Sequence, residues 1–188
     1  MKKIVILSVI LVLSVFVFTS CASKDEQPQN NDTAVETSVF GKFSAKDLDG
    51  NTVTESVFAE NNLTMVNIWA TFCGPCINEM PHLGEIAQEY ADKGVGIVGI
   101  VVDAADATGA VSDKLVQEAV DIVGYTNAGY LHIIPSAEMY KAKLNTVYSV
   151  PETIFVDSQG NQVGESYLGA RSKDAWMEII DELLGEVQ

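Results

Sequence analysis

Two cysteines separated by two residues form the part of this sequence best suited to chemistry. They belong to the segment Cys73-Gly74-Pro75-Cys76. Thiols at this spacing can be oxidised to a disulfide, and the thiolate of one can attack a disulfide in another molecule. The third cysteine of the chain, Cys21, lies far earlier, so no wider disulfide framework is available. A redox couple is therefore the first interpretation of the pair.

A metal site is the main alternative for two cysteines at this spacing. Zinc needs about four ligands, and the two histidines of the chain, His82 and His132, do not lie at finger-like spacing. Soft thiolates also suit Cu(I), so a copper-binding lipoprotein that uses both cysteines and a histidine is a separate hypothesis. We expect no resident metal and no cofactor.

The elements around the pair predict how it is positioned. An apolar strand at 63–70 precedes it, and a helix at 74–93 begins within it, with apolar residues at helical spacing up to Gly94. The N-terminus of a helix has unpaired N–H groups and a positive potential, which lower the pKa of a cysteine. We therefore expect Cys73 to attack and Cys76, one turn deeper, to resolve the mixed disulfide.

The two residues between the cysteines suit this position. Pro75 lacks an N–H group and is tolerated in the first turn of a helix. Gly74 has no side chain and would let the backbone come close to a bound partner.

The rest of the pattern alternates strands and helices. We expect a hairpin at 43–58 that turns at Asp49-Gly50, and strands at 95–102, 153–156 and 163–168. We also expect helices at 112–123 and 136–144, a last helix after Ser172, and no assigned element at 124–135. This order predicts an α/β domain with a central mixed β-sheet flanked by helices.

Several single residues receive structural rather than chemical interpretations. Trp69 and Trp176 are expected in the core, and His82 on a helix surface. Asp103 and Asp106 are expected to be solvated acids at the end of a strand. Residues 103–135 lie between the cysteine motif and Pro151, where loops often carry recognition, so they are candidates for choosing a partner.

Residues 1–20 have the features of a secretory signal peptide. Two lysines are followed by an apolar run at 4–18, which is shorter than the roughly 20 residues that span a bilayer. Small residues then precede Cys21, as in the bacterial lipobox, in which the new N-terminal cysteine is diacylated on sulfur; Phe18 departs from the usual Leu. We expect cleavage before Cys21 and a lipid anchor on it. Ordinary secretion, with Cys21 as an incidental thiol, is the alternative.

The mature chain would be strongly acidic. The sequence has 11 basic and 26 acidic residues, and cleavage before Cys21 would remove two lysines and no acid. Nucleic acid and anionic headgroups would both be repelled by such a surface, so membrane attachment should depend on acyl chains. Residues 21–39 are polar and are expected to form a flexible tether. The folded domain is expected at 40–188.

Two segments resemble the TlpA/ResA-type thioredoxin-like family, over about residues 40–185. The first is Val66-Asn67-Ile68-Trp69-Ala70-Thr71-Phe72-Cys73-Gly74-Pro75-Cys76, with Glu79 and Pro81 after it. The second runs from Val150 to Asp157 and resembles the segment in which a cis-proline of the family faces the active-site cysteines. The resemblance implies a thioredoxin fold with a cis Pro151. The backbone of Val150 would then be exposed for strand-like pairing with a substrate peptide.

The resemblance also implies roles for three residues near the cysteines. Asn67 stands where ordinary thioredoxins carry a buried aspartate, and an amide cannot relay a proton. Glu79 matches a carboxylate that the family places beneath the active site, so we expect it to accept the proton of Cys76; a solvated acid on the helix surface is the alternative. Phe72 replaces the tryptophan common before the first cysteine and keeps an apolar rim.

These features favour a lipid-anchored thiol:disulfide oxidoreductase on the extracytoplasmic face of the cell membrane. The Gly-Pro dipeptide matches that of reducing thioredoxins, which favours a reductase. The resemblance implies a membrane electron donor of the DsbD/CcdA kind. It also implies clients among exported proteins, including apocytochrome c.

Other activities of the same fold stay open. An oxidase or isomerase would use the same cysteines, because direction depends on how strongly the thiolate is stabilised. A thiol peroxidase is a further alternative, for which Thr71 is the one suggestive residue. A purely structural interaction module would tolerate Cys73→Ser.

Overall fold

The computed structural model of the chain describes residues 38–187. The predicted signal peptide, Cys21 and nearly all of the predicted tether lie outside the described residues. Within 38–187, no helix is long and apolar enough to cross a bilayer.

The described residues form strands and helices in alternation. The strands are β1 (Ser44–Asp47), β2 (Thr52–Thr54), β3 (Leu63–Trp69), β4 (Val95–Val101), β5 (Leu131–Ile134), β6 (Glu152–Asp157) and β7 (Gln162–Leu168). The α-helices are α1 (Gly74–Tyr90), α2 (Asp113–Thr126), α3 (Ala137–Ala142) and α4 (Lys173–Val187). Short 3₁₀ helices are η1 (Glu55–Glu60), η2 (Ala91–Lys93) and η3 (Leu144–Thr146).

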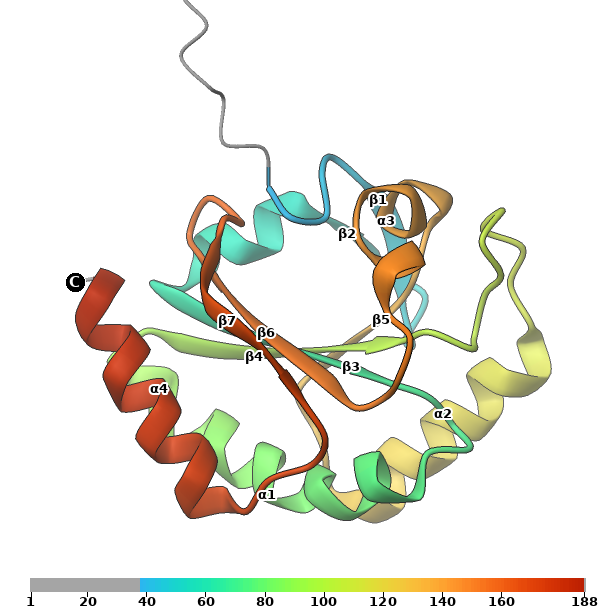
Figure 1. Cartoon of the computed structure of the whole chain (residues 1–188). Coiled ribbons are helices and arrows are strands. Elements are labelled where there is room, and N and C mark those ends of the chain that lie inside the picture. Colours follow the sequence, from blue (N-terminus) through green and yellow to red (C-terminus); the bar gives the residue numbers. More distant parts are fainter. Residues whose placement is uncertain (1–37, 188) are drawn as a thin grey trace, which may run out of the picture. The chain divides into compact units, whose positions relative to one another are not determined.

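The strands form one mixed sheet in the order β2-β1-β5-β4-β3-β6-β7. The inner strands β3, β4 and β5 are parallel, and the strands outside them pair in the antiparallel sense. Helices α1, α2 and α4 lie on one side of the sheet, and α3 lies on the other side (Figure 1). The predicted α/β class, central mixed sheet and N-terminal hairpin are therefore confirmed.

Side chains of β3 alternate between two cores, and this alternation determines the side of the sheet that Asn67 faces. Val66 and Ile68 pack in the cluster that includes Phe58 of η1, whereas Met65 packs with side chains of α1 and α4. Because successive side chains of a strand point to opposite faces, Asn67 faces the same side as Met65. That side is covered by α1, which carries Cys76.

Two expectations about element bounds need correction. Residues 124–135, to which we assigned no element, contain β5, which pairs with β4 on one side and with β1 on the other. Its four residues include a histidine and are too few to show a period. Helix α2 also continues beyond 123 to Thr126, where Asn127 ends it in the left-handed conformation with φ 55°. The predicted side-chain cap of Ser112 is present, since its hydroxyl accepts from the N–H of Leu115.

A buried histidine ties β5 to the strand that precedes the cysteines. Trp69 Nε1 donates to His132 Nδ1 at 3.2 Å, and His132 Nε2 lies 3.0 Å from the carbonyl of Ala128. The neutral ring with its proton on Nε2 satisfies both contacts. Gly99 leaves space for this ring, because a Cβ there would lie 2.3 Å from His132 Nδ1. Burial lowers the pKa of His132 from 6.5 to about 4.

This lowered pKa predicts how stability depends on pH. Between about pH 6.5 and 4, His132 is protonated in the unfolded chain but stays neutral in the folded protein. The free energy of unfolding therefore falls as the pH falls. The contribution of this group is at most about 1.4 kcal/mol per pH unit and about 3 kcal/mol in total. Urea unfolding from pH 7 to 4 should therefore show a shallower pH dependence for His132→Gln than for the wild type. An equal pH dependence for the variant and the wild type would contradict the lowered pKa of His132.

Candidate active site

The two cysteines of the motif form a disulfide at the start of α1. Cys73 and Cys76 are bonded, with their Cα atoms 5.3 Å apart. Cys73 is the N-cap residue of α1, and its sulfur accepts from the N–H of Cys76 at 3.3 Å. Cys73 is 4% exposed and Cys76 fully buried. Cys73 is therefore the less buried of the two cysteines, and it lies at the N-terminus of α1, which favours a thiolate.

The residues next to the cysteines in the chain differ in their exposure and packing. Phe72 is 78% exposed, which is unusual for a large apolar side chain. Pro75 lies in the first turn of α1, where the sequence placed it. A Cβ at Gly74 would meet no atom within 4 Å, so packing within the described chain does not explain this glycine.

The loop before β6 faces the same cluster. The Val150–Pro151 peptide bond is cis, as the family resemblance implied. Val150 packs against the apolar cluster that contains both cysteines. The carbonyl of Pro151 accepts from the N–H of Gly169 at 2.9 Å, which joins this loop to the end of β7.

An ion pair holds the cis-proline loop at its base. Lys143 Nζ lies 2.6 Å from Glu152 Oε1, and the two side chains are 14% and 6% exposed. Glu152 follows Pro151 directly and begins β6, whereas Lys143 follows α3. The pair therefore joins both ends of the segment that carries Val150 and Pro151. No local pattern in the sequence indicated it.

Glu79 is buried beneath the disulfide rather than solvated. It lies one helical turn after Cys76 and is 2% exposed. Its Oε1 accepts from Asn67 Nδ2 at 3.1 Å, and its Oε2 accepts from the N–H of Arg171 at 3.1 Å and from Trp176 Nε1 at 3.2 Å. Burial raises the pKa of Glu79, and these donors oppose the rise by stabilising the charged form. Glu79 is therefore a buried carboxyl group whose pKa is raised and whose two oxygens both accept hydrogen bonds.

Asn67 joins this carboxyl group to the sheet. Asn67 and Thr153 are register partners on β3 and β6, and Asn67 Nδ2 donates to Thr153 Oγ1 at 3.1 Å as well as to Glu79. Asn67 and Glu79, which the sequence analysis singled out separately, are thus in direct contact. Sequence reasoning missed the donors from Arg171 and Trp176, because both lie beyond β7 and no short spacing relates them to Glu79.

Comparison with known proteins identifies the family to which this chain belongs. Residues 29–179 match the Redoxin family. The chain belongs to the Redoxin family. The thiol-disulfide oxidoreductase ResA of Oceanobacillus iheyensis is 29% identical over 136 residues, which cover 71% of this chain and 62% of that protein. The thiol:disulfide interchange protein DsbE of Haemophilus influenzae is 27% identical over 186 residues, which cover 96% and 94%.

A solved structure shares the fold of this Redoxin. The thiol:disulfide interchange protein of Chlorobium tepidum superposes with a TM-score of 0.62 and 23% sequence identity. The match covers 77% of this chain and 94% of that protein. This confirms the thioredoxin-like fold, and the curated relatives show that the family homologues are thiol-disulfide oxidoreductases.

The surroundings of Asp103 differ from the expectation that it is a solvated acid at the end of a strand. It is not a freely solvated acid but a half-buried one that holds the loop before Cys73. Its carboxylate accepts from the N–H of Thr71 at 3.0 and 3.1 Å and from the Thr71 hydroxyl at 2.6 Å. Asp106, in contrast, is exposed as expected. Parallel register pairs Trp69 with Val101, and continuing it by two residues brings Thr71 to Asp103, so this contact depends on a register that no local sequence pattern gives.

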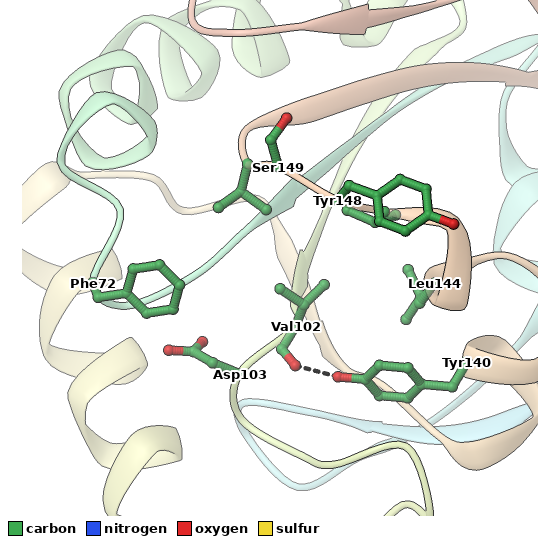
Figure 2. Close-up of a pocket in the computed structure, with 9 residues that line it drawn as sticks. Phe72, Val102, Asp103, Tyr140, Leu144, Tyr148 and Ser149 are labelled. Atoms are coloured by element: carbon green, nitrogen blue, oxygen red, sulfur yellow. Dashed lines mark hydrogen bonds between the residues drawn. The ribbon is translucent and has the colours of Figure 1, made fainter.

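A groove of about 450 Å³ opens between this loop and the cis-proline loop. Figure 2 shows Phe72 and Asp103 at one end and Tyr140, Leu144 and Tyr148 at the other. The groove is lined by Phe72, Val102, Asp103, Tyr140, Leu144, Val147, Tyr148, Ser149 and Val150. The hydroxyl of Tyr140 donates to the carbonyls of Val102 and Ala105, and these bonds hold the ring in place at the side of the groove. The groove therefore adjoins both Cys73 and Pro151 through their chain neighbours.

Proposed function

We propose that this protein is an extracytoplasmic thiol:disulfide oxidoreductase that reduces disulfides of exported proteins and is anchored by a lipid on Cys21. The observation that carries the proposal is the Cys73–Cys76 disulfide at the N-terminus of α1, with a buried carboxyl group one turn behind it. Relatives named ResA and DsbE support the reaction class. The leader-like residues 1–20 support export.

The reaction follows from the different burial of the two sulfurs. In the reduced protein, the Cys73 thiolate attacks one sulfur of a client disulfide, and the other client sulfur leaves as a thiolate. The thiolate of Cys76 then attacks the Cys73 sulfur of the mixed disulfide. The Cys73–Cys76 bond forms, the client leaves as a dithiol, and two electrons have passed from the protein to the client.

Glu79 supplies the base for the second step. Cys76 is fully buried, so its thiol needs an acceptor inside the protein before it can attack. Glu79 lies on the next turn of the same helix, and its raised pKa suits a group that takes up this proton. Asn67, Arg171 and Trp176 orient the carboxyl group through the hydrogen bonds described above.

The cis-proline loop supplies the second half of the client site. Val150, which precedes the cis-proline, packs against the apolar cluster of the cysteines, so an extended client segment would pair with the backbone of Val150. The reductase direction is supported by the Gly-Pro dipeptide. It requires a membrane donor of the DsbD/CcdA kind to return the protein to the dithiol, and apocytochrome c is among the clients that the family resemblance implies.

Two alternatives receive less support from the site. A peroxidase would need the Thr71 hydroxyl near the attacking sulfur, but this hydroxyl donates to Asp103. A copper carrier would need a histidine beside the cysteines, but His82 is exposed and His132 bonds to Trp69 and Ala128. In the described part of the chain, no three side chains of His, Cys, Asp or Glu gather as a metal site.

The role of Glu79 can be tested by replacing it with glutamine. Glu79→Gln keeps the size of the side chain but cannot accept the proton of Cys76, so the mixed disulfide should resolve on the order of tenfold more slowly or worse at neutral pH. Rapid acid quenching and alkylation would measure its lifetime. Glu85→Gln, an exposed change of the same charge on the same helix, is the control and should resolve normally. Equal lifetimes for the two variants would reject the role.

The direction of electron flow can be tested in cells. Acid quenching followed by alkylation should trap Cys73 and Cys76 mainly as thiols at steady state, because a reductase is kept reduced by its donor. Inactivation of the membrane donor should shift the pair to the disulfide. A pair that is mainly oxidised in unperturbed cells would identify an oxidant and overturn the proposal.

A further inference from the structure

The groove beside the cysteine motif has one charged residue in an otherwise uncharged and mostly apolar or aromatic lining. Among the nine described residues that line it, Asp103 alone carries a charge. The other end of the groove is formed by Leu144, Val147 and Tyr148, and Tyr148 is 90% exposed. A segment that fills this groove therefore meets a carboxylate near Cys73 and apolar surface farther away.

The Asp103 carboxylate has no cationic partner in the described structure. Its hydrogen bonds come from the backbone and hydroxyl of Thr71, which are both uncharged. The ion pairs within residues 38–187 join Lys143 to Glu152 and Lys173 to Glu85 and Glu89, and none includes Asp103. No cation within the described residues therefore neutralises this carboxylate, whose residue lines the groove.

The aromatic ring of Phe72 lines the same end of the groove. It is 78% exposed, and Figure 2 shows the Asp103 carboxylate at this end together with the ring. A guanidinium group can pair with a carboxylate and stack on an aromatic face at once, because it is planar and weakly hydrated. An ammonium group can use the same two contacts less specifically. An anionic side chain would be repelled.

We infer that this groove binds a client segment with an arginine or lysine next to its reacting cysteine, and that Asp103 selects it. The inference rests on the proposed function, since the client must reach Cys73. The apolar end of the groove takes the uncharged part of the same segment. The strongly acidic chain, with 26 acidic and 11 basic residues, adds a long-range attraction for such a cation. Within the groove, Asp103 alone provides a charged contact at short range, and Phe72 provides the stacking contact.

A chromogenic peptide assay tests the inference. Three matched peptides carry one cysteine as a mixed disulfide with nitrothiobenzoate, flanked on both sides by arginine, glutamine or glutamate. Attack by Cys73 on the peptide sulfur forms the Cys73–peptide disulfide and releases the coloured thiolate. The full-length protein with Cys21→Ser, reduced and held in mild detergent, would be used so that one thiol pair reacts.

The expected result is a rate order of arginine, then glutamine, then glutamate. We expect an arginine-to-glutamine ratio of about tenfold, since an ion pair and a stacking contact act together. The ratio should fall as ionic strength rises. Asp103→Asn should lower the ratio most, and Phe72→Leu should lower it less, without altering any bond of Thr71. Asp106→Asn, an exposed acid nearby, makes the same change in net charge and should keep the ratio.

Each outcome separates this inference from the proposed function. If all three peptides react with the wild type at equal rates, the protein is a thiol oxidoreductase but the inference is wrong. If Asp103→Asn and Asp106→Asn lower the ratio equally, general charge rather than the groove selects the peptide, and the inference is again wrong. If no peptide reacts, both fail. An unchanged reduction potential in Asp103→Asn would show that the lost preference does not come from a disturbed disulfide.

Discussion

A carboxyl group enclosed behind the disulfide is the constraint on which the rest of this site depends. A buried carboxylate is costly unless donors surround it, and the donors to Glu79 come from separate segments: Asn67 on β3, the backbone of Arg171 after β7, and Trp176 on α4. The carboxyl group therefore requires the sheet, α1 and α4 to lie as they do. Their arrangement also leaves its pKa raised, because burial outweighs the three hydrogen bonds.

The two sides of the disulfide serve different purposes. On the inner side, Cys76 and Glu79 are both buried and lie one helical turn apart on α1. On the outer side, Phe72, Asp103 and the cis-proline loop border an open groove. Asp103 holds Thr71 just before the cysteines, and it also lines the groove. The Lys143–Glu152 ion pair fixes the far wall by joining the ends of the cis-proline segment.

The sequence predicted the elements that have a strong local pattern. The helix from Gly74 follows from apolar residues at helical spacing, and β3 and β4 follow from apolar runs. The place of Glu79 beneath the cysteines was implied by the family resemblance. Strand β5 was missed, because four residues cannot display a period and its pairing with β1 and β4 is decided by tertiary contact. Trp176 was correctly placed in the core, but its bond to Glu79 joins residues far apart in the chain. The interpretation of Asp103 was wrong, because the register between two parallel strands decides its environment.

The central claim is that Cys73 and Cys76 form a redox couple that works as a reductant. The most direct test is a redox titration of the full-length protein with Cys21→Ser, equilibrated in graded thiol–disulfide buffers and trapped by alkylation. We predict a reversible two-electron transition near that of thioredoxin, at about −270 mV. A transition near about −120 mV would mark an oxidant, and no transition at all would contradict the account of this site.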